Sequence, residues 1–302
     1  MKSILYIPAK LIVLGLLLHL NMPFASAQTS VAGYPVPNDT SQISLSHLAA
    51  YITGSEPMSS LERTDKIIDW TYKNMDWSLS SNKYRSPKEI LKRGGGNSQD
   101  ITVLTHAILI ASGVQTRWIE EVNIQPEKKQ RQKSAESKMK EKGNNASLSG
   151  SRHCNHRWLE FWDEQAREWA PADPSLGVTG MDEWIKARVK FGERMQGAVL
   201  SNREMIVPIG VYVVNAQGNQ VLEDRTSHYV IDAFNQYYGN KLNSLNSWKT
   251  WEQRISSIDP YVQHAIKGEA NLHEQEKLIS ELAVSYDQLK KEYQDYLQTS
   301  RQ

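Results

Sequence analysis

The seven residues GGGNSQD, residues 94–100, decide the fold that the sequence predicts. A short helix is expected just before them at residues 87–92, with Pro87 in the first helical position. A longer stretch at residues 100–112 follows, apolar on nearly every side as a buried central helix is. Three successive glycines end the first helix. The turn therefore brings Ser98 to the beginning of a buried helix.

Two later segments supply the partners that such a serine would need. A strand is expected at residues 156–162 and begins with His156, and its hairpin partner at residues 168–172 runs into Asp173. Unpaired N–H groups and the positive dipole at a helix start stabilise an anion there. A histidine can then act as base, and an aspartate can orient it. Ser98, His156 and Asp173 are thus the candidate catalytic residues.

Five short motifs, taken in order, resemble the transglutaminase-like superfamily over residues 61–177. They are SPKEILKRG at 86–94, GNSQD at 96–100, ASGVQTRWI at 111–119, HRWLEFW at 156–162 and WAPADPS at 169–175. The resemblance implies an α+β, papain-related core, in which a helix carrying the nucleophile packs on an antiparallel sheet. It also implies a cysteine at the helix start that attacks an amide, with histidine and aspartate on neighbouring strands.

The chain departs from this pattern at the nucleophile, because Ser98 stands at the cysteine position. A thiol beside a histidine can rest as a thiolate, whereas a serine must lose its proton to the base during attack. Three interpretations follow: a catalytically degenerate domain that binds a peptide or protein in its cleft, a serine-dependent amidase, peptidase or acyltransferase, or chemistry of another kind. Gly96, Asn97, Trp158 and Trp169 are expected to line or support the cleft, and Asp100 to cap the helix.

The only cysteine, Cys154, offers two weaker hypotheses. It could replace the missing thiol, but it leaves the expected strand on the same face as His156 and lies far from any helix start. His153, Cys154 and His156 could also bind zinc or copper, although three ligands on one strand rarely complete a tetrahedron. We therefore expect no metal and no cofactor.

The ends and the composition indicate an exported protein. Lys2 and Lys10 flank a short apolar lead that continues to Leu20, and Ala25-Ser26-Ala27 is a signal-peptidase site. We expect cleavage after Ala27 and a periplasmic or secreted product. With 35 basic and 34 acidic residues, the chain has no charge excess for nucleic acid or membranes, and one cysteine excludes an internal disulfide.

The expected domain organisation follows from composition along the chain. A flexible lead covers residues 28–44, a transglutaminase-like domain residues 45–180, and an α/β then helical extension residues 181–302. Helices are expected at 60–74 and 181–195, a strand at 114–124, and a hairpin of strands at 206–214 and 220–223. An apolar-poor, basic insertion at about residues 125–152 reads as a surface loop, or as a lid or contact for an acidic partner. Asn38 and Asn145 match glycosylation acceptors.

The last segment carries a heptad pattern. Apolar residues recur every seven positions in two series, which are Leu272, Ile279, Tyr286 and Tyr293, and Leu282, Leu289 and Tyr296. Three heptads are short for a free coiled coil. The helix either docks on its own domain or forms a homodimer.

Overall fold

The computed structural model describes residues 30–31, 34–35, 44–77, 84–124, 153–191 and 207–300. The expected signal peptide, most of the lead, the basic insertion, Asn38 and Asn145 lie outside these residues and stay predictions. The chain divides into two compact units, Met1–Asp39 and Thr40–Gln302. In the first, β1 (Ser30–Val31) pairs antiparallel with β2 (Tyr34–Pro35).

An antiparallel sheet of six strands is the centre of the second unit. Its order is β10-β9-β5-β6-β7-β8. The strands are β5 (Thr116–Ile124), β6 (His153–Asp163), β7 (Glu168–Asp173), β8 (Val178–Thr179), β9 (Val207–Val214) and β10 (Val221–Asp224). A separate parallel pair joins β3 (Asp76–Trp77) to β4 (Gly95–Gly96). The predicted α+β fold is confirmed, and β9 and β10 show that residues after 180 continue the same sheet.

The first four helices begin at side-chain caps, whereas the later ones do not. The helices are α1 (Leu45–Thr53), α2 (Ser60–Asn74), α3 (Pro87–Arg93), α4 (Ser98–Ala111), α6 (Met181–Arg188), α7 (Phe234–Tyr237), α8 (Asn246–Ile266) and α9 (Glu276–Thr299). Shorter turns are the π-helix η1 (His228–Ala233) and the 3-10 helices η2 (Leu242–Ser244) and η3 (Leu272–Gln275). Reciprocal capping boxes start α2, α3 and α4. The helices predicted at 60–74 and 87–92 are confirmed.

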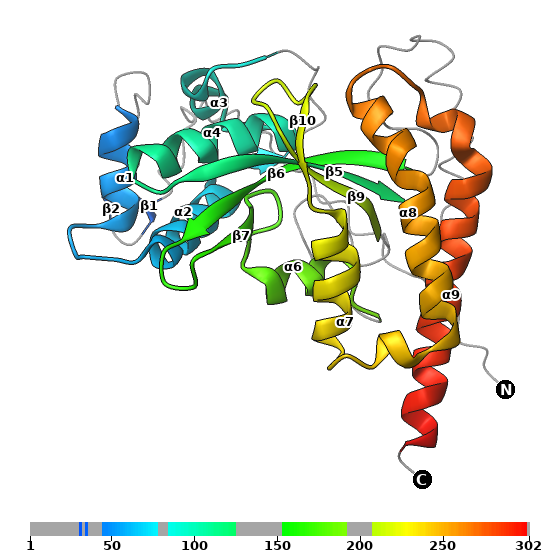
Figure 1. The fold of residues 1–302 in the computed structure, drawn as a ribbon. Coiled ribbons are helices and arrows are strands. Elements are labelled where there is room, and N and C mark those ends of the chain that lie inside the picture. Colours follow the sequence, from blue (N-terminus) through cyan, green and yellow to red (C-terminus); the bar gives the residue numbers. More distant parts are fainter. Residues whose placement is uncertain are drawn as a thin grey trace, which may run out of the picture. The chain divides into compact units, whose positions relative to one another are not determined.

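Helices cover both faces of the sheet (Figure 1). On one face, Trp118 of β5 packs against His106 of α4, with the ring centroids 4.3 Å apart and the rings tilted by 41°. On the other face, Trp158 of β6 packs against Trp184 of α6 and Tyr229 of η1. Since neighbouring strand residues point to opposite faces, these contacts place α4 on one side and α6 with η1 on the other.

The heptad-patterned segment docks on its own domain. Leu272, Ile279, Leu282, Tyr286 and Leu289 are all buried in the same core as β9 and α8. Figure 1 shows α8 and α9 side by side as an antiparallel pair at the β9 end of the sheet. The two terminal positions, Tyr293 and Tyr296, are only partly buried against that core. The structure thus accounts for the heptad seam within one chain.

Two predicted helices differ from the structure. The helix from Ser98 is not buried on every side, because Ile110 is 51% exposed near its end. The helix predicted at 181–195 ends at Arg188 instead. Beyond that residue, tertiary contacts take the backbone groups that a longer helix would use: the Val189 carbonyl accepts from Tyr286, and the Phe191 amide donates to Tyr238.

Candidate functional site

The start of α4 is held by a tight polar cap. The Asn97 side chain accepts from the Asp100 amide at 2.9 Å, and Asp100 accepts from the Asn97 amide at 3.3 Å. Arg85 also donates to the Asp100 carboxylate at 2.8 Å. Gly96 must be glycine, since a Cβ there would lie 2.3 Å from Asp100 Oδ2. The predicted capping role of Asp100 is confirmed, and Ser98 follows as the first helical residue, partly exposed.

The first turn of α4 docks on the edge of β6 beside His156. Thr102, one helical turn after Ser98, donates from Oγ1 to the Arg157 carbonyl at 2.8 Å. That carbonyl is open because β7 pairs with β6 only from Leu159 onward. The uncovered stretch of strand edge therefore brings the beginning of α4 next to the residue that follows His156.

His156 and Asp173 form the expected contact. The ring Nε2 lies 2.7 Å from Asp173 Oδ2, and because a carboxylate only accepts, Nε2 carries the proton. Asp173 is fully buried, while the imidazole is 13% exposed. Asp173 Oδ1 accepts from the Ser175 amide at 3.0 Å, which fixes the carboxylate plane. This leaves Nδ1 as the ring nitrogen able to take a proton.

Two further residues that the sequence did not single out complete the polar group around Asp173. Arg188 donates from Nη2 to Asp173 Oδ2 at 2.6 Å and from Nε to Glu121 Oε1 at 2.8 Å. Trp158 donates its indole N–H to the other oxygen of Glu121 at 2.7 Å. A buried charge needs a partner, so a glutamate within the strand predicted at residues 114–124 was the available signal for this pairing.

Opposing effects act on the protonation of this group. Burial by itself raises the pKa of Asp173, but the neighbouring His156, Arg188 and the Ser175 amide together lower that pKa below its ordinary value. The two carboxylates of Asp173 and Glu121 keep the Arg188 guanidinium charged and raise its pKa despite burial. Asp173 is therefore a carboxylate, as an orienting partner of histidine must be.

Residues 46–174 match the family model of the transglutaminase-like superfamily. This stretch is a transglutaminase-like domain. The match ends just after Asp173 and does not include α6, which supplies Arg188. The papain-related fold expected from the motifs is confirmed on this ground.

The solved structures that match this chain are distant from it. A candidate cysteine protease from Cytophaga hutchinsonii shares 18% identity over 43% of this chain and 36% of its own, with a TM-score of 0.29. A candidate protease from Parabacteroides distasonis shares 12% over 45% and 25%, also at 0.29. LapG of Legionella pneumophila shares 14% over 63% and 82%, at 0.31. The chain thus spans about a third or less of the first two proteins, and likeness at this level does not bear on activity. A comparison with curated protein sequences found no match.

In the transglutaminase-like domain, the three candidate catalytic residues are only partly connected. Ser98 and His156 are both described, and within the described residues no hydrogen bond joins the Ser98 hydroxyl to the imidazole. Among the described residues, the imidazole is oriented by Asp173, and the Ser98 hydroxyl has no base bound to it.

The tryptophans differ in their surroundings. Trp158 is a fully buried core residue that also supports Glu121. Trp169 is half-buried, 5.5 Å from the Trp162 ring, and has the Arg117 guanidinium 4.5 Å above its own ring. Both are support residues of the sheet.

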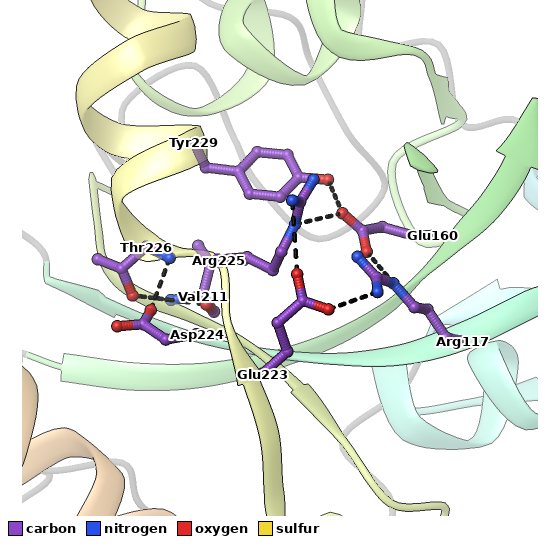
Figure 2. Close-up of polar contacts among 8 residues, drawn as sticks. All are labelled: Arg117, Glu160, Val211, Glu223, Asp224, Arg225, Thr226 and Tyr229. Atoms are coloured by element: carbon purple, nitrogen blue, oxygen red, sulfur yellow. Dashed lines mark hydrogen bonds and ion pairs between the residues drawn. The ribbon is translucent and has the colours of Figure 1, made fainter. Parts of the chain in front are cut away.

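A second buried carboxylate lies farther along β6 (Figure 2). Glu160 is fully buried and accepts from Arg117 at 2.6 Å, from Arg225 at 3.3 Å and from the Tyr229 hydroxyl at 2.6 Å. Arg117 also donates to Glu223 of β10 at 2.6 Å. This cluster ties the residues after 180 to the transglutaminase-like domain.

Metal ligands and membrane spans were also considered. Over the described ranges, no group of three or more His, Cys, Asp or Glu side chains is placed to hold a metal ion. The side chains of His153 and Cys154 lie outside the description, so both hypotheses on them stay predictions. Within the described part of the chain, no helix combines the length and apolar character that a membrane span requires.

Proposed function

We propose that this chain is an exported, catalytically silent member of the transglutaminase-like superfamily that binds a peptide or protein segment around Ser98 and His156. The observation that carries the proposal is the missing hydrogen bond between the Ser98 hydroxyl and the His156 ring within the described residues. A serine hydroxyl becomes a nucleophile only when a base takes its proton. A thiol would be less dependent on that contact.

The second candidate is a serine-dependent amidase, peptidase or acyltransferase. The ordered pair of His156 and Asp173 favours it, because Nε2 is held at 2.7 Å and Nδ1 is left to accept a proton. Contacts between nucleophile and base often tighten only when substrate binds. The two candidates differ in one property, which is whether Ser98 reacts.

A fluorophosphonate probe separates them. We expect no labelling of the folded wild type above the level of Ser98→Ala, the matched control that removes only the hydroxyl. Labelling of the wild type that Ser98→Ala abolishes would establish the serine enzyme and refute the silent domain.

Ser98→Cys tests whether the surroundings still suit a thiol. We expect this variant to react with iodoacetamide faster than free cysteine, because a helix N-terminus and a histidine favour the thiolate. The chain's own Cys154 requires a Cys154→Ala background in both arms. Reaction no faster than free cysteine would mean that the site no longer supports thiol chemistry.

Binding is tested with a phage-displayed library of random peptides. We expect enriched peptides to bind the wild type and Ser98→Ala equally. They should not bind Ser98→Arg, because the long arginine side chain covers the surface around residue 98. Peptides that bind all three forms alike would place the binding surface elsewhere and contradict the proposal.

Export is tested on the mature protein. The proposal predicts that its N-terminal sequence begins at Gln28, after the alanine site that the leader presents. A product that retains Met1 and remains in the cytoplasm would contradict this part of the proposal.

A further inference from the structure

We propose that Arg188 is a positioning residue of the His156 site, one that selects Asp173 rather than Glu121 as the carboxylate that orients the imidazole. The inference deepens the proposed function because it concerns the same site. It does not depend on which ligand binds there. Arg188 comes from α6, beyond the stretch that matches the family model.

Two carboxylates lie within reach of the same imidazole. Glu121 is the direct cross-strand partner of His156 in the β5–β6 ladder, and side chains opposed in this way lie about 5 Å apart at Cβ. Asp173 reaches the ring from the other side, on β7. Without further control, the imidazole could donate to either acceptor.

Arg188 biases that choice toward Asp173. Its Nε donates to Glu121 Oε1 at 2.8 Å, and Trp158 donates to Glu121 Oε2 at 2.7 Å, so both oxygens of this carboxylate are engaged. Its Nη2 reaches Asp173 Oδ2 at 2.6 Å, the same oxygen that accepts from His156. The planar fork of a guanidinium spans two acceptors at fixed angles, which an ammonium group does not. Arg188 thus competes with the imidazole for Glu121 and holds Asp173 Oδ2 at the place where the imidazole donates to it.

A purely structural role explains the arrangement less well. Removing Arg188, Glu121 and Asp173 from water costs free energy that their attraction seldom returns, and apolar side chains of similar volume often serve as well. Arg188 is 1% exposed, and within the described residues its Nη1 has no hydrogen-bond partner. Its Nε and Nη2 instead bind Glu121 and Asp173, the two carboxylates that could accept from the imidazole.

The test uses Arg188→Lys, which keeps the positive charge and both carboxylates but cannot bridge Glu121 and Asp173 as the guanidinium does. The readout is the ¹⁵N spectrum of the His156 ring at about pH 8.5, where an ordinary histidine is neutral. We expect the wild type to show the Nε2–H tautomer alone and Arg188→Lys a mixture of both tautomers. The spectra of both forms are recorded at the same pH.

A second readout follows reactivity. In the Ser98→Cys and Cys154→Ala background, we expect Arg188→Lys to slow iodoacetamide alkylation of residue 98 about tenfold or more, as misplaced groups do. The matched control is Arg225→Met, which breaks a contact to another buried carboxylate, Glu160, in the cluster of Figure 2. We expect that control to keep the tautomer and the alkylation rate.

An unchanged tautomer and an alkylation rate within twofold of the background would overturn the proposal. If Arg188→Lys fails to fold by circular dichroism, Arg188→Gln answers the same question, since it also keeps both carboxylates and its short amide cannot bridge them. An unmixed tautomer in that variant would likewise refute the role of Arg188. Labelling of Ser98 by fluorophosphonate would refute only the silent domain and leave this inference standing.

Discussion

His156 and Arg188 share one acceptor, because both donate to Oδ2 of Asp173, at 2.7 and 2.6 Å. The imidazole and the guanidinium come from β6 and α6, which are separated by a hairpin and a turn. A single buried oxygen thus connects the family motif with a helix outside it. The stability of this connection can be measured directly.

We expect Asp173→Asn to lower the free energy of unfolding by about 3 kcal/mol, because it leaves the buried Arg188 with one charged partner fewer. Urea unfolding measures the change. The matched control is Glu164→Gln in the exposed β6–β7 turn, expected to stay within about 0.5 kcal/mol. Equal effects of the two substitutions would mean that the ion pair adds nothing.

The same carboxylate predicts a pH dependence. Its folded-state pKa lies below the unfolded value of about 3.9, so its contribution to stability is present above that value. The contribution is lost as the pH falls through the lower, folded-state pKa. We therefore expect the difference in unfolding free energy between wild type and Asp173→Asn to shrink below about pH 4. A difference that stays constant from about pH 6 down to about pH 3, on either side of the ordinary aspartate pKa of about 3.9, would contradict this.

Gly96 and Gly94 form a matched pair for the turn before α4. Gly96→Ala places a methyl group 2.3 Å from Asp100 Oδ2, and we expect it to destabilise by about 3 kcal/mol through displacement of the cap. Gly94 has φ +73° but open space around it, so Gly94→Ala should cost only about 1 kcal/mol of backbone strain. Thermal unfolding ranks the two, and the reverse order would contradict the packing argument.

Glu160 and Glu223 contrast a buried with an exposed carboxylate in the same cluster (Figure 2). We expect Glu160→Gln to cost about 3 to 5 kcal/mol, since Arg117 and Arg225 lose a fully buried partner. Glu223→Gln should lower the free energy of unfolding by at most about 1 kcal/mol, because the Glu223 side chain is 45% exposed. Urea unfolding of the two variants checks the ratio, and similar values would refute the ranking.

The C-terminal helix α9 is expected to stabilise one chain. Leu282 is fully buried, so Leu282→Ala should cost about 2 to 5 kcal/mol, while Val284→Ala, at a position 52% exposed, should have little effect. We expect a monomeric mass in solution for the wild type. A wild-type dimer that Leu282→Ala dissociates would mean that the heptad seam joins two copies of the chain, and would contradict this prediction.

Much of the fold could be predicted from local patterns. Alternation in residues 156–162 and the turn at 163–167 define a hairpin, and Ser86 with Glu89 marks a helix start. The observed helix boundaries differ from the predicted ones where tertiary contacts determine them. The helix after Gly180 ends at Arg188 because the hydroxyls of Tyr286 and Tyr238 bind the next backbone groups.

The sequence alone determined the helix start at Ser98, the strand that carries His156 and the absence of the expected thiol, because these depend on residue type and short spacing. Only the tertiary structure decided that Arg188 and Glu121 surround Asp173, and that the heptad seam faces its own domain. Those contacts join residues 67 and 15 positions apart in the chain. Buried charges find their partners through the packing of the sheet against α6, and no local pattern records that packing.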